Sequence, residues 1–139
     1  MEEWITYAII AALFIAVRDI FSKHISHKYS YIDYVGYATL ITTIGIWSYI
    51  FINNIQMQPL DTKYFLLIVV RIIIAYMIVE PAIYYCLKKS KNTGEASSII
   101  NLNVVFAFFL SIYAFNATFN TEKLGGILLI LLGGYYVTK

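Results

Sequence analysis

The sequence predicts an all-α, polytopic membrane protein whose five transmembrane helices form one domain over residues 1–139. Hydrophobic residues make up 60% of the chain and charged residues 13%, whereas soluble domains carry about 25% charged residues. The apolar residues gather in five stretches with short polar segments between them. A soluble bundle of helices that are apolar on every face would have no polar residues to cover it, so we expect lipid as the solvent.

The lengths of the apolar stretches fit membrane crossing. A helix that rises about 1.5 Å per residue needs roughly 20 apolar residues to cross a hydrocarbon core about 30 Å thick. Three stretches meet this length, and the first falls just short of it. The fifth spans only 14 residues, but polar residues on either side can carry its ends through the interface. The stretches are residues 4–21, 32–52, 64–85, 96–115 and 124–137.

The connections between the stretches hold only 8 to 11 residues each. Connections this short make consecutive helices neighbours and leave no room for a separate catalytic domain. We therefore expect one domain. The connections are residues 22–31, 53–63, 86–95 and 116–123.

Lysine and arginine residues favour one side of the membrane by seven to two. Because cytoplasmic loops carry an excess of these residues, the bias predicts an integral membrane protein with an external N-terminus and a cytoplasmic C-terminus. Tyr29, Tyr31 and Tyr34 at the start of the second stretch are expected to anchor it in the interface. The residues on the cytoplasmic side are Arg18, Lys23, Lys28, Lys88, Lys89, Lys91 and Lys139, and those on the other side are Lys63 and Lys123.

Several function classes lack the residues that they need. The single cysteine, Cys86, excludes an internal disulfide and a multi-thiolate metal site. His24 and His27 lie three residues apart, but two ligands without a third make a poor metal site. The sequence holds no nucleophilic triad, paired-carboxylate site or phosphate loop, so we expect neither an enzyme nor a cofactor or metal. A net charge of +2 is too small to predict a nucleic-acid partner, which leaves the lipid bilayer as the first partner.

Charged residues at membrane depth are the strongest functional indicators, since each costs about 2.5–3.5 kcal/mol near the bilayer centre. Arg18 and Glu80 lie at similar depth near the cytoplasmic ends of their stretches, which predicts an ion pair between them. Asp19 would then bind Lys23, one helical turn further on. Alternatively, Arg18 reaches the headgroups, and Glu80 is protonated or wetted beside a kink at Pro81.

The third stretch carries Arg71, roughly 10 Å inside its external end. No carboxylate of the chain lies at the same predicted depth. The side chain either extends outward to the headgroups or faces a water-filled cavity, where its guanidinium could bind a carboxylate or phosphate. Further along, Pro81 has no amide hydrogen, so we expect it to kink the helix and free a carbonyl near Met77.

The fourth and fifth stretches carry patterned polar and small residues. In the fourth, Ser97, Asn101 and Ser111 recur on one helix face, together with Phe108. A buried asparagine either bonds to a neighbouring helix or lines a polar pathway. In the fifth, glycines recur seven and eight residues apart, and they would either pack inside the chain or form an oligomer seam. These glycines are Gly125, Gly126, Gly133 and Gly134.

The most specific motifs lie in the last third of the chain. Small residues at positions 96–98 open the fourth stretch, the run Leu102-Asn103-Val104-Val105-Phe106 follows, and a Leu/Ile run lies between the two glycine pairs. In these motifs residues 84–139 resemble the end of an EamA-type repeat of the drug/metabolite transporter superfamily, with Val104 in place of the family's proline. The resemblance implies one five-helix half-repeat of a fold that usually fuses two repeats in opposite orientations.

By this resemblance, the protein is expected to be a half-size transporter of a small polar or anionic metabolite that acts as a dimer. Its partner would be a second copy or an oppositely oriented small membrane protein, although the charge bias opposes insertion of one chain both ways. The alternative is a non-transporting structural or assembly protein that reuses the helix bundle. The residues expected to line a pathway are Arg71, Glu80, Ser97, Asn101 and Ser111.

Overall fold

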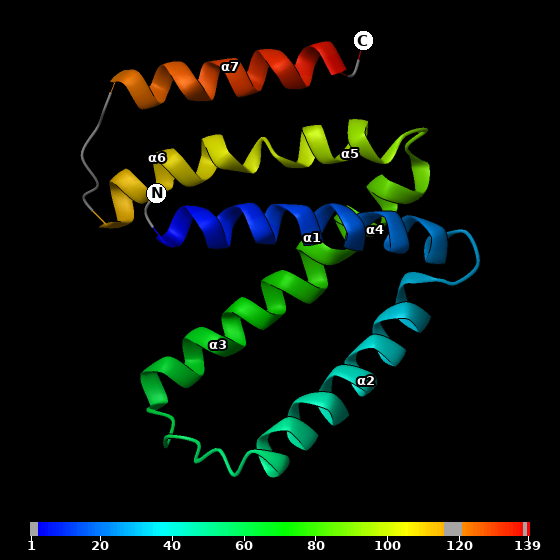
Figure 1. The fold of residues 1–139 in the computed structure, drawn as a ribbon, viewed down its shortest axis with the longest axis vertical. Coiled ribbons are helices and arrows are strands. Elements are labelled where there is room, and N and C mark those ends of the chain that lie inside the picture. The colour runs from blue at the N-terminus through cyan, green and yellow to red at the C-terminus, as the bar shows by residue number, and fades with distance from the viewer. Residues whose placement is uncertain (1–2, 116–120, 138) are drawn as a thin grey trace. The chain divides into compact units, whose positions relative to one another are not determined.

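The computed structural model of the chain describes residues 3–115, 121–137 and 139, so residues 116–120 of the predicted fourth connection lie outside it. Every regular element in the described residues is a helix, which confirms the all-α class. The helices are α1 (Glu3–Ser26), α2 (Tyr31–Ile52), α3 (Thr62–Ile74), the π-helical turn η1 (Ala75–Val79), α4 (Glu80–Lys89), α5 (Thr93–Ile100), α6 (Asn103–Phe115) and α7 (Thr121–Val137) (Figure 1).

The chain divides into two compact units. The first, here called the α5–α7 unit, consists of Met1–Phe21 and Lys89–Lys139 and includes most of α1. The second, the α2–α4 unit, is Ser22–Lys88. The short connections predict a single domain. The division into two compact units does not test that expectation, which stays a prediction.

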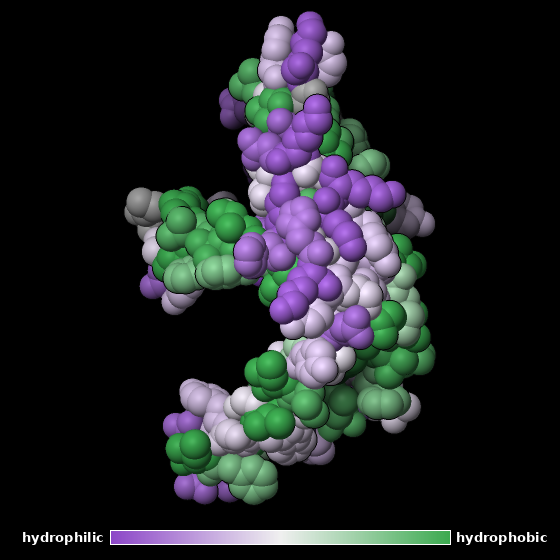
Figure 2. Space-filling model, turned by 90° about the vertical axis from the view of Figure 1, so that its right-hand side faces the viewer, coloured by the Kyte–Doolittle hydropathy of each residue, from purple (hydrophilic) through white to green (hydrophobic). Residues whose placement is uncertain are grey.

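Four helical spans in the described part of the chain are long and apolar enough to cross a membrane. Their side chains are mostly exposed, and Figure 2 shows apolar side chains over large areas of the face in view. A helix satisfies its own backbone hydrogen bonds, so such spans are stable in hydrocarbon, where the exposed apolar surface is not in contact with water. The spans are Glu3–Ser26, Tyr31–Ile52, Thr62–Lys89 and Thr93–Phe115, and α7 adds a fifth apolar helix of 17 residues.

Side-chain caps fix where α2, α3 and α5 begin. The Ser30 hydroxyl accepts a hydrogen bond from the amide of Asp33 at 3.2 Å, and the Asp33 carboxylate accepts one from the Ser30 amide at 3.3 Å. Asp61 and Asn92 each accept from the amide two residues on, at 3.2 and 2.9 Å. Each cap satisfies a donor that the first turn of a helix leaves free.

Tyrosine side chains pack and hydrogen-bond between the start of α2 and α4. The Tyr84 hydroxyl donates to the carbonyl of Tyr29 at 2.7 Å, and the Tyr84 ring lies 5.6 Å from the ring centroids of both Tyr31 and Tyr34. Tyr31 and Tyr84 are only 7% and 3% exposed. Tyr31 is therefore a packing residue of the α2–α4 unit rather than an interfacial anchor with its ring in the headgroups.

The kink expected at Pro81 takes the form of the π-helical turn η1. In this turn the amide of Glu80 donates to the carbonyl of Ala75, five residues back. Pro81 has no amide hydrogen with which to continue that register, so the carbonyl of Tyr76 has no helical donor. The hydroxyl of Tyr31 donates to this carbonyl at 2.7 Å. The freed carbonyl of Tyr76 lies next to Met77, near which the sequence predicts it, and the wider turn selects Tyr76 because it shifts the register by one residue.

The fourth span is broken between α5 and α6, whereas the sequence suggested one continuous helix. The amides at positions 102, 104 and 105 donate to carbonyls three residues back, at 3.0, 3.1 and 3.0 Å. A continuous α-helix would direct these amides to carbonyls four residues back. The carbonyls of Ser98 and Ile100 therefore lose the donors that an α-helix would give them.

Candidate functional site

Arg71 lines a shallow, open pocket of about 350 Å³ in the α2–α4 unit. The other residues around the pocket are apolar and lie along one side of α3 and η1. A guanidinium is always charged and presents five donors in a planar fork. Arg71 is itself exposed, so both predicted alternatives, extension to the headgroups and contact with a water-filled cavity, stay predictions. The residues that line the pocket are Leu67, Val70, Arg71, Ile74, Ala75 and Val79.

The π-helical turn changes where Glu80 lies around the helix relative to Arg71. Nine residues of continuous α-helix would place the two side chains on opposite sides, roughly 180° apart. Because η1 takes up one extra residue, the offset falls to roughly 80°. Glu80 is half-buried at the start of α4. A cation and an anion thus occupy adjoining sides of one span, about 12 Å apart along its axis.

A buried carboxylate joins α1 to α5 in the other unit. Asp19 is 4% exposed. Its Oδ1 accepts hydrogen bonds from Arg18 Nη2 at 2.9 Å and Arg18 Nε at 3.2 Å, and its Oδ2 accepts one from the Ser97 hydroxyl at 3.1 Å. The Arg18 side chain is about half exposed. The carboxylate is held on both oxygens, and this contact places Ser97 of the predicted polar face against α1.

The structure places the other two polar residues of that face differently. Asn101 is exposed and lies at the break between α5 and α6. The Ser111 hydroxyl donates to the carbonyl of Phe108 at 2.8 Å, within its own helix. Asn101 is therefore close in sequence to the carbonyls of Ser98 and Ile100, whose α-helical donors turn elsewhere at the break. In membrane transporters, irregular backbone of this kind commonly lines a cavity.

The four glycines of α7 do not share one environment. Gly134 lies on the packed face of the helix, where an added Cβ would be 3.6 Å from the carbonyl oxygen of Ser98 in α5. Figure 1 shows α5 and α7 side by side, and the two helices are in contact. Gly125, Gly126 and Gly133 are exposed, and an added Cβ at each would meet no atom within 4 Å. Packing within the chain thus accounts for Gly134, while an oligomer seam at the other three stays a prediction.

The model of the EamA-like transporter family matches residues 3–139 of the chain. The chain belongs to the EamA-like transporter family. The match confirms the resemblance inferred from residues 84–139 and extends it to almost the whole chain. Neither the curated proteins nor the solved structures contain a match to the chain. With its apolar helical spans, this EamA-like protein is an integral membrane protein of a transporter family.

Sequence reasoning singled out most charged residues of this EamA-like chain but not all of their partners. It paired Arg18 with Glu80, which belong to different units, and that ion pair stays a prediction. The Asp19–Lys23 contact also stays a prediction beside the two partners that the structure gives Asp19. The spacing of residues 18, 19 and 97 contains no signal for the Arg18–Asp19–Ser97 contact, because it joins helices that are far apart in sequence.

Proposed function

We propose that this EamA-like chain is a half-size transporter of a small polar or anionic metabolite and that it acts as a dimer. The observation that carries the proposal is Arg71, which lines a pocket within a membrane-spanning segment of a transporter-family protein. An arginine near the bilayer centre costs about 2.5–3.5 kcal/mol on insertion scales. A charged residue placed at that cost is expected to serve a polar pathway or a ligand.

The chemistry of the pocket supports an anionic group on the substrate. A guanidinium binds carboxylate or phosphate through two parallel hydrogen bonds, which fixes the orientation of the ligand as well as its charge. Glu80 on the adjoining side of the span would repel a second anionic group and attract a cationic one. A small carboxylate or phosphate compound, with or without an amino group, therefore suits these two charges best.

The proposed dimer follows from the size of the repeat. Transporters with inverted repeats bind substrate at the interface of two repeats, and a single repeat supplies only one wall of such a site. The exposed glycines Gly125, Gly126 and Gly133 offer a surface on which a partner helix could approach closely. The partner is a second copy or an oppositely oriented small membrane protein, and Ser97, Asn101 and Ser111 would add polar groups to the path.

Solute flux into liposomes that contain the purified chain tests the proposal. The wild-type chain should carry at least one member of a panel of small carboxylates and phosphates. Arg71→Gln should lower that flux about tenfold or more, because a charge-assisted hydrogen bond contributes about 1.5–3 kcal/mol. Arg71→Lys should keep part of the flux, since it retains the charge but not the planar fork.

Lys63→Gln is the matched control, because it removes a cation at the first turn of the same helix and outside the pocket. It should leave the flux unchanged. Wild-type flux that survives Arg71→Gln would place the pathway elsewhere in the chain. A complete lack of flux across the panel, from a folded and correctly inserted protein, would favour a structural or assembly role.

A further inference from the structure

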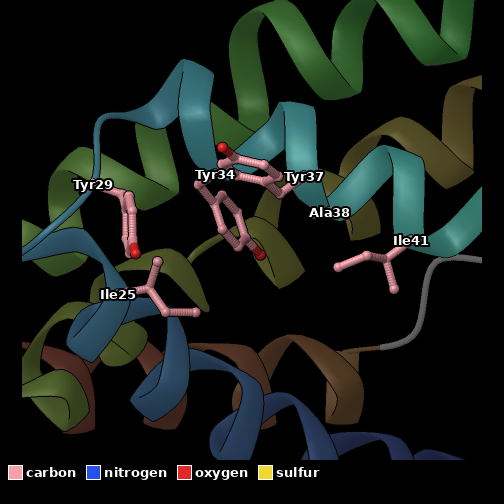
Figure 3. A pocket seen from close by; sticks show the side chains of 6 residues that line it. All are labelled: Ile25, Tyr29, Tyr34, Tyr37, Ala38 and Ile41. Atoms are coloured by element: carbon pink, nitrogen blue, oxygen red, sulfur yellow. The ribbon is translucent and has the colours of Figure 1, made fainter.

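A second pocket, of about 490 Å³, lies between the C-terminal end of α1 and the first turns of α2 (Figure 3). Its volume falls within the ~300–1,000 Å³ range of small-molecule sites. Figure 3 shows Ile25, Tyr29 and Tyr34 around a common space, with Ile41 at its far end. All of the lining residues belong to the α2–α4 unit. They are Ile25, Tyr29, Tyr34, Tyr37, Ala38 and Ile41.

The α2 side of the pocket is a stripe of apolar and aromatic side chains. Positions 34, 37, 38 and 41 recur at the three- and four-residue spacing of one helix face and extend about 10 Å along the axis. Tyr34 is held as a wall of the pocket, since one face of its ring stacks on Tyr84 at 5.6 Å and 24°. Because α2 is a membrane-spanning helix, this stripe is suited to an acyl chain that enters from the bilayer.

Positive charge lies at the other end of the pocket. The Lys28 ammonium lies 5.5 Å from the ring centroid of Tyr29, which lines the pocket. Residues 22–30 contain two lysines and two histidines and no carboxylate. Asp33, the acid that follows, already accepts a 2.6 Å hydrogen bond from the Ser30 hydroxyl in the α2 cap. Residues 22–33 thus carry two lysines against one carboxylate, and this excess of positive charge favours an anion at this end of the pocket.

We propose that the pocket binds an anionic phospholipid, with its phosphate beside Lys28 and an acyl chain along the α2 stripe. A phospholipid combines the two chemistries that the pocket presents, and it is already concentrated at the interface where α2 begins. The charge bias predicts that this end of α2 lies in the cytoplasmic leaflet, where anionic lipids are abundant. This lipid site is separate from the Arg71 pocket and does not depend on transport.

Native mass spectrometry of the full chain, released from detergent micelles, measures the site directly. The probes are phosphatidylglycerol and phosphatidylcholine with identical acyl chains. We expect one phosphatidylglycerol to bind per chain more tightly than phosphatidylcholine. Lys28→Gln should weaken that binding about fivefold, the effect of losing one lysine near an anionic surface. Ala38→Phe, which fills the apolar end of the pocket, should abolish the preferred site.

Two control variants should leave lipid binding unchanged. Lys63→Gln removes a lysine far along the chain from the pocket. Gly36→Phe adds a ring on the opposite side of the same helix, at a position where a Cβ meets no atom within 4 Å. Helix content measured by circular dichroism must match the wild type for every variant. Equal affinity for the two lipids would overturn the proposal that the site selects an anionic headgroup. Unchanged phosphatidylglycerol binding by Lys28→Gln would overturn it too. Full displacement of the lipid by inorganic phosphate, or unchanged binding by Ala38→Phe, would overturn the acyl-chain site.

Discussion

At the scale of single residues, the Tyr31 hydroxyl satisfies a backbone group that Pro81 leaves without a donor. The sequence predicts the problem, because proline always removes an amide hydrogen from the helix. It does not predict the solution, because Tyr31 lies 45 residues earlier in the chain than the Tyr76 carbonyl that it meets. Tyrosines at the start of an apolar stretch also fit interfacial anchoring, so composition alone does not separate the two roles.

Tyr31→Phe should destabilise the protein while Tyr34→Phe does not. The first variant keeps the ring against Tyr84 but removes the hydrogen bond to the Tyr76 carbonyl, which should lower the free energy of unfolding by about 1 kcal/mol. Tyr34 is the matched control, because it stacks on the same ring and its hydroxyl makes no hydrogen bond in the described part of the chain. Unfolding in mixed detergent–SDS micelles, followed by circular dichroism, compares the two. Equal stability of both variants would contradict a role for the Tyr31 hydroxyl.

At the scale of helices, the apolar stretches locate the spans, but two of the spans are irregular inside. Length and composition predict where the third and fourth spans cross, because both follow directly from the bilayer thickness. The π-helical turn was foreseeable only as a kink at Pro81. The break at Asn101 had no sequence signal, since Val104 stands where the family places a proline and the surrounding residues suit a continuous helix.

Pro81→Ala should straighten the third span. The new amide can donate to the carbonyl four residues back, so the π-helical turn is no longer required and Glu80 should move away from the side of Arg71. Spin labels at Lys63→Cys and Lys88→Cys, in a Cys86→Ser background, report the change as a longer and narrower distance distribution. The backbone separation should approach the ~37 Å of a straight helix.

Pro59→Ala is the control for this measurement, because Pro59 lies in the connection before α3 rather than inside the span. It should leave the distance distribution unchanged. If Pro81→Ala also leaves it unchanged, packing around Tyr31 rather than the missing amide holds the turn open.

At the scale of the whole molecule, the sequence predicts fold class and family because both depend on features spread along the chain. The hydropathy of the apolar stretches indicates that the helices lie in lipid. The motifs of residues 84–139 indicate the family, and the match over residues 3–139 confirms it. Assembly is a different kind of property. It depends on surfaces such as the exposed side of α7. The glycine pattern of this helix does not distinguish packing against a helix of the same chain from packing against a partner.

The orientation of the C-terminus decides which assembly a transporter could use. A bias of seven to two in lysine and arginine residues predicts one population, with the C-terminus in the cytoplasm. A pair of C-terminal reporters, one active only in the cytoplasm and one only outside, measures this in intact cells. A single cytoplasmic population excludes an antiparallel homodimer, because that dimer needs the same chain inserted both ways. An EamA-like pathway built from inverted repeats would then require an oppositely oriented partner protein. Two populations of similar size would contradict the predicted orientation and would make the antiparallel homodimer the simplest assembly.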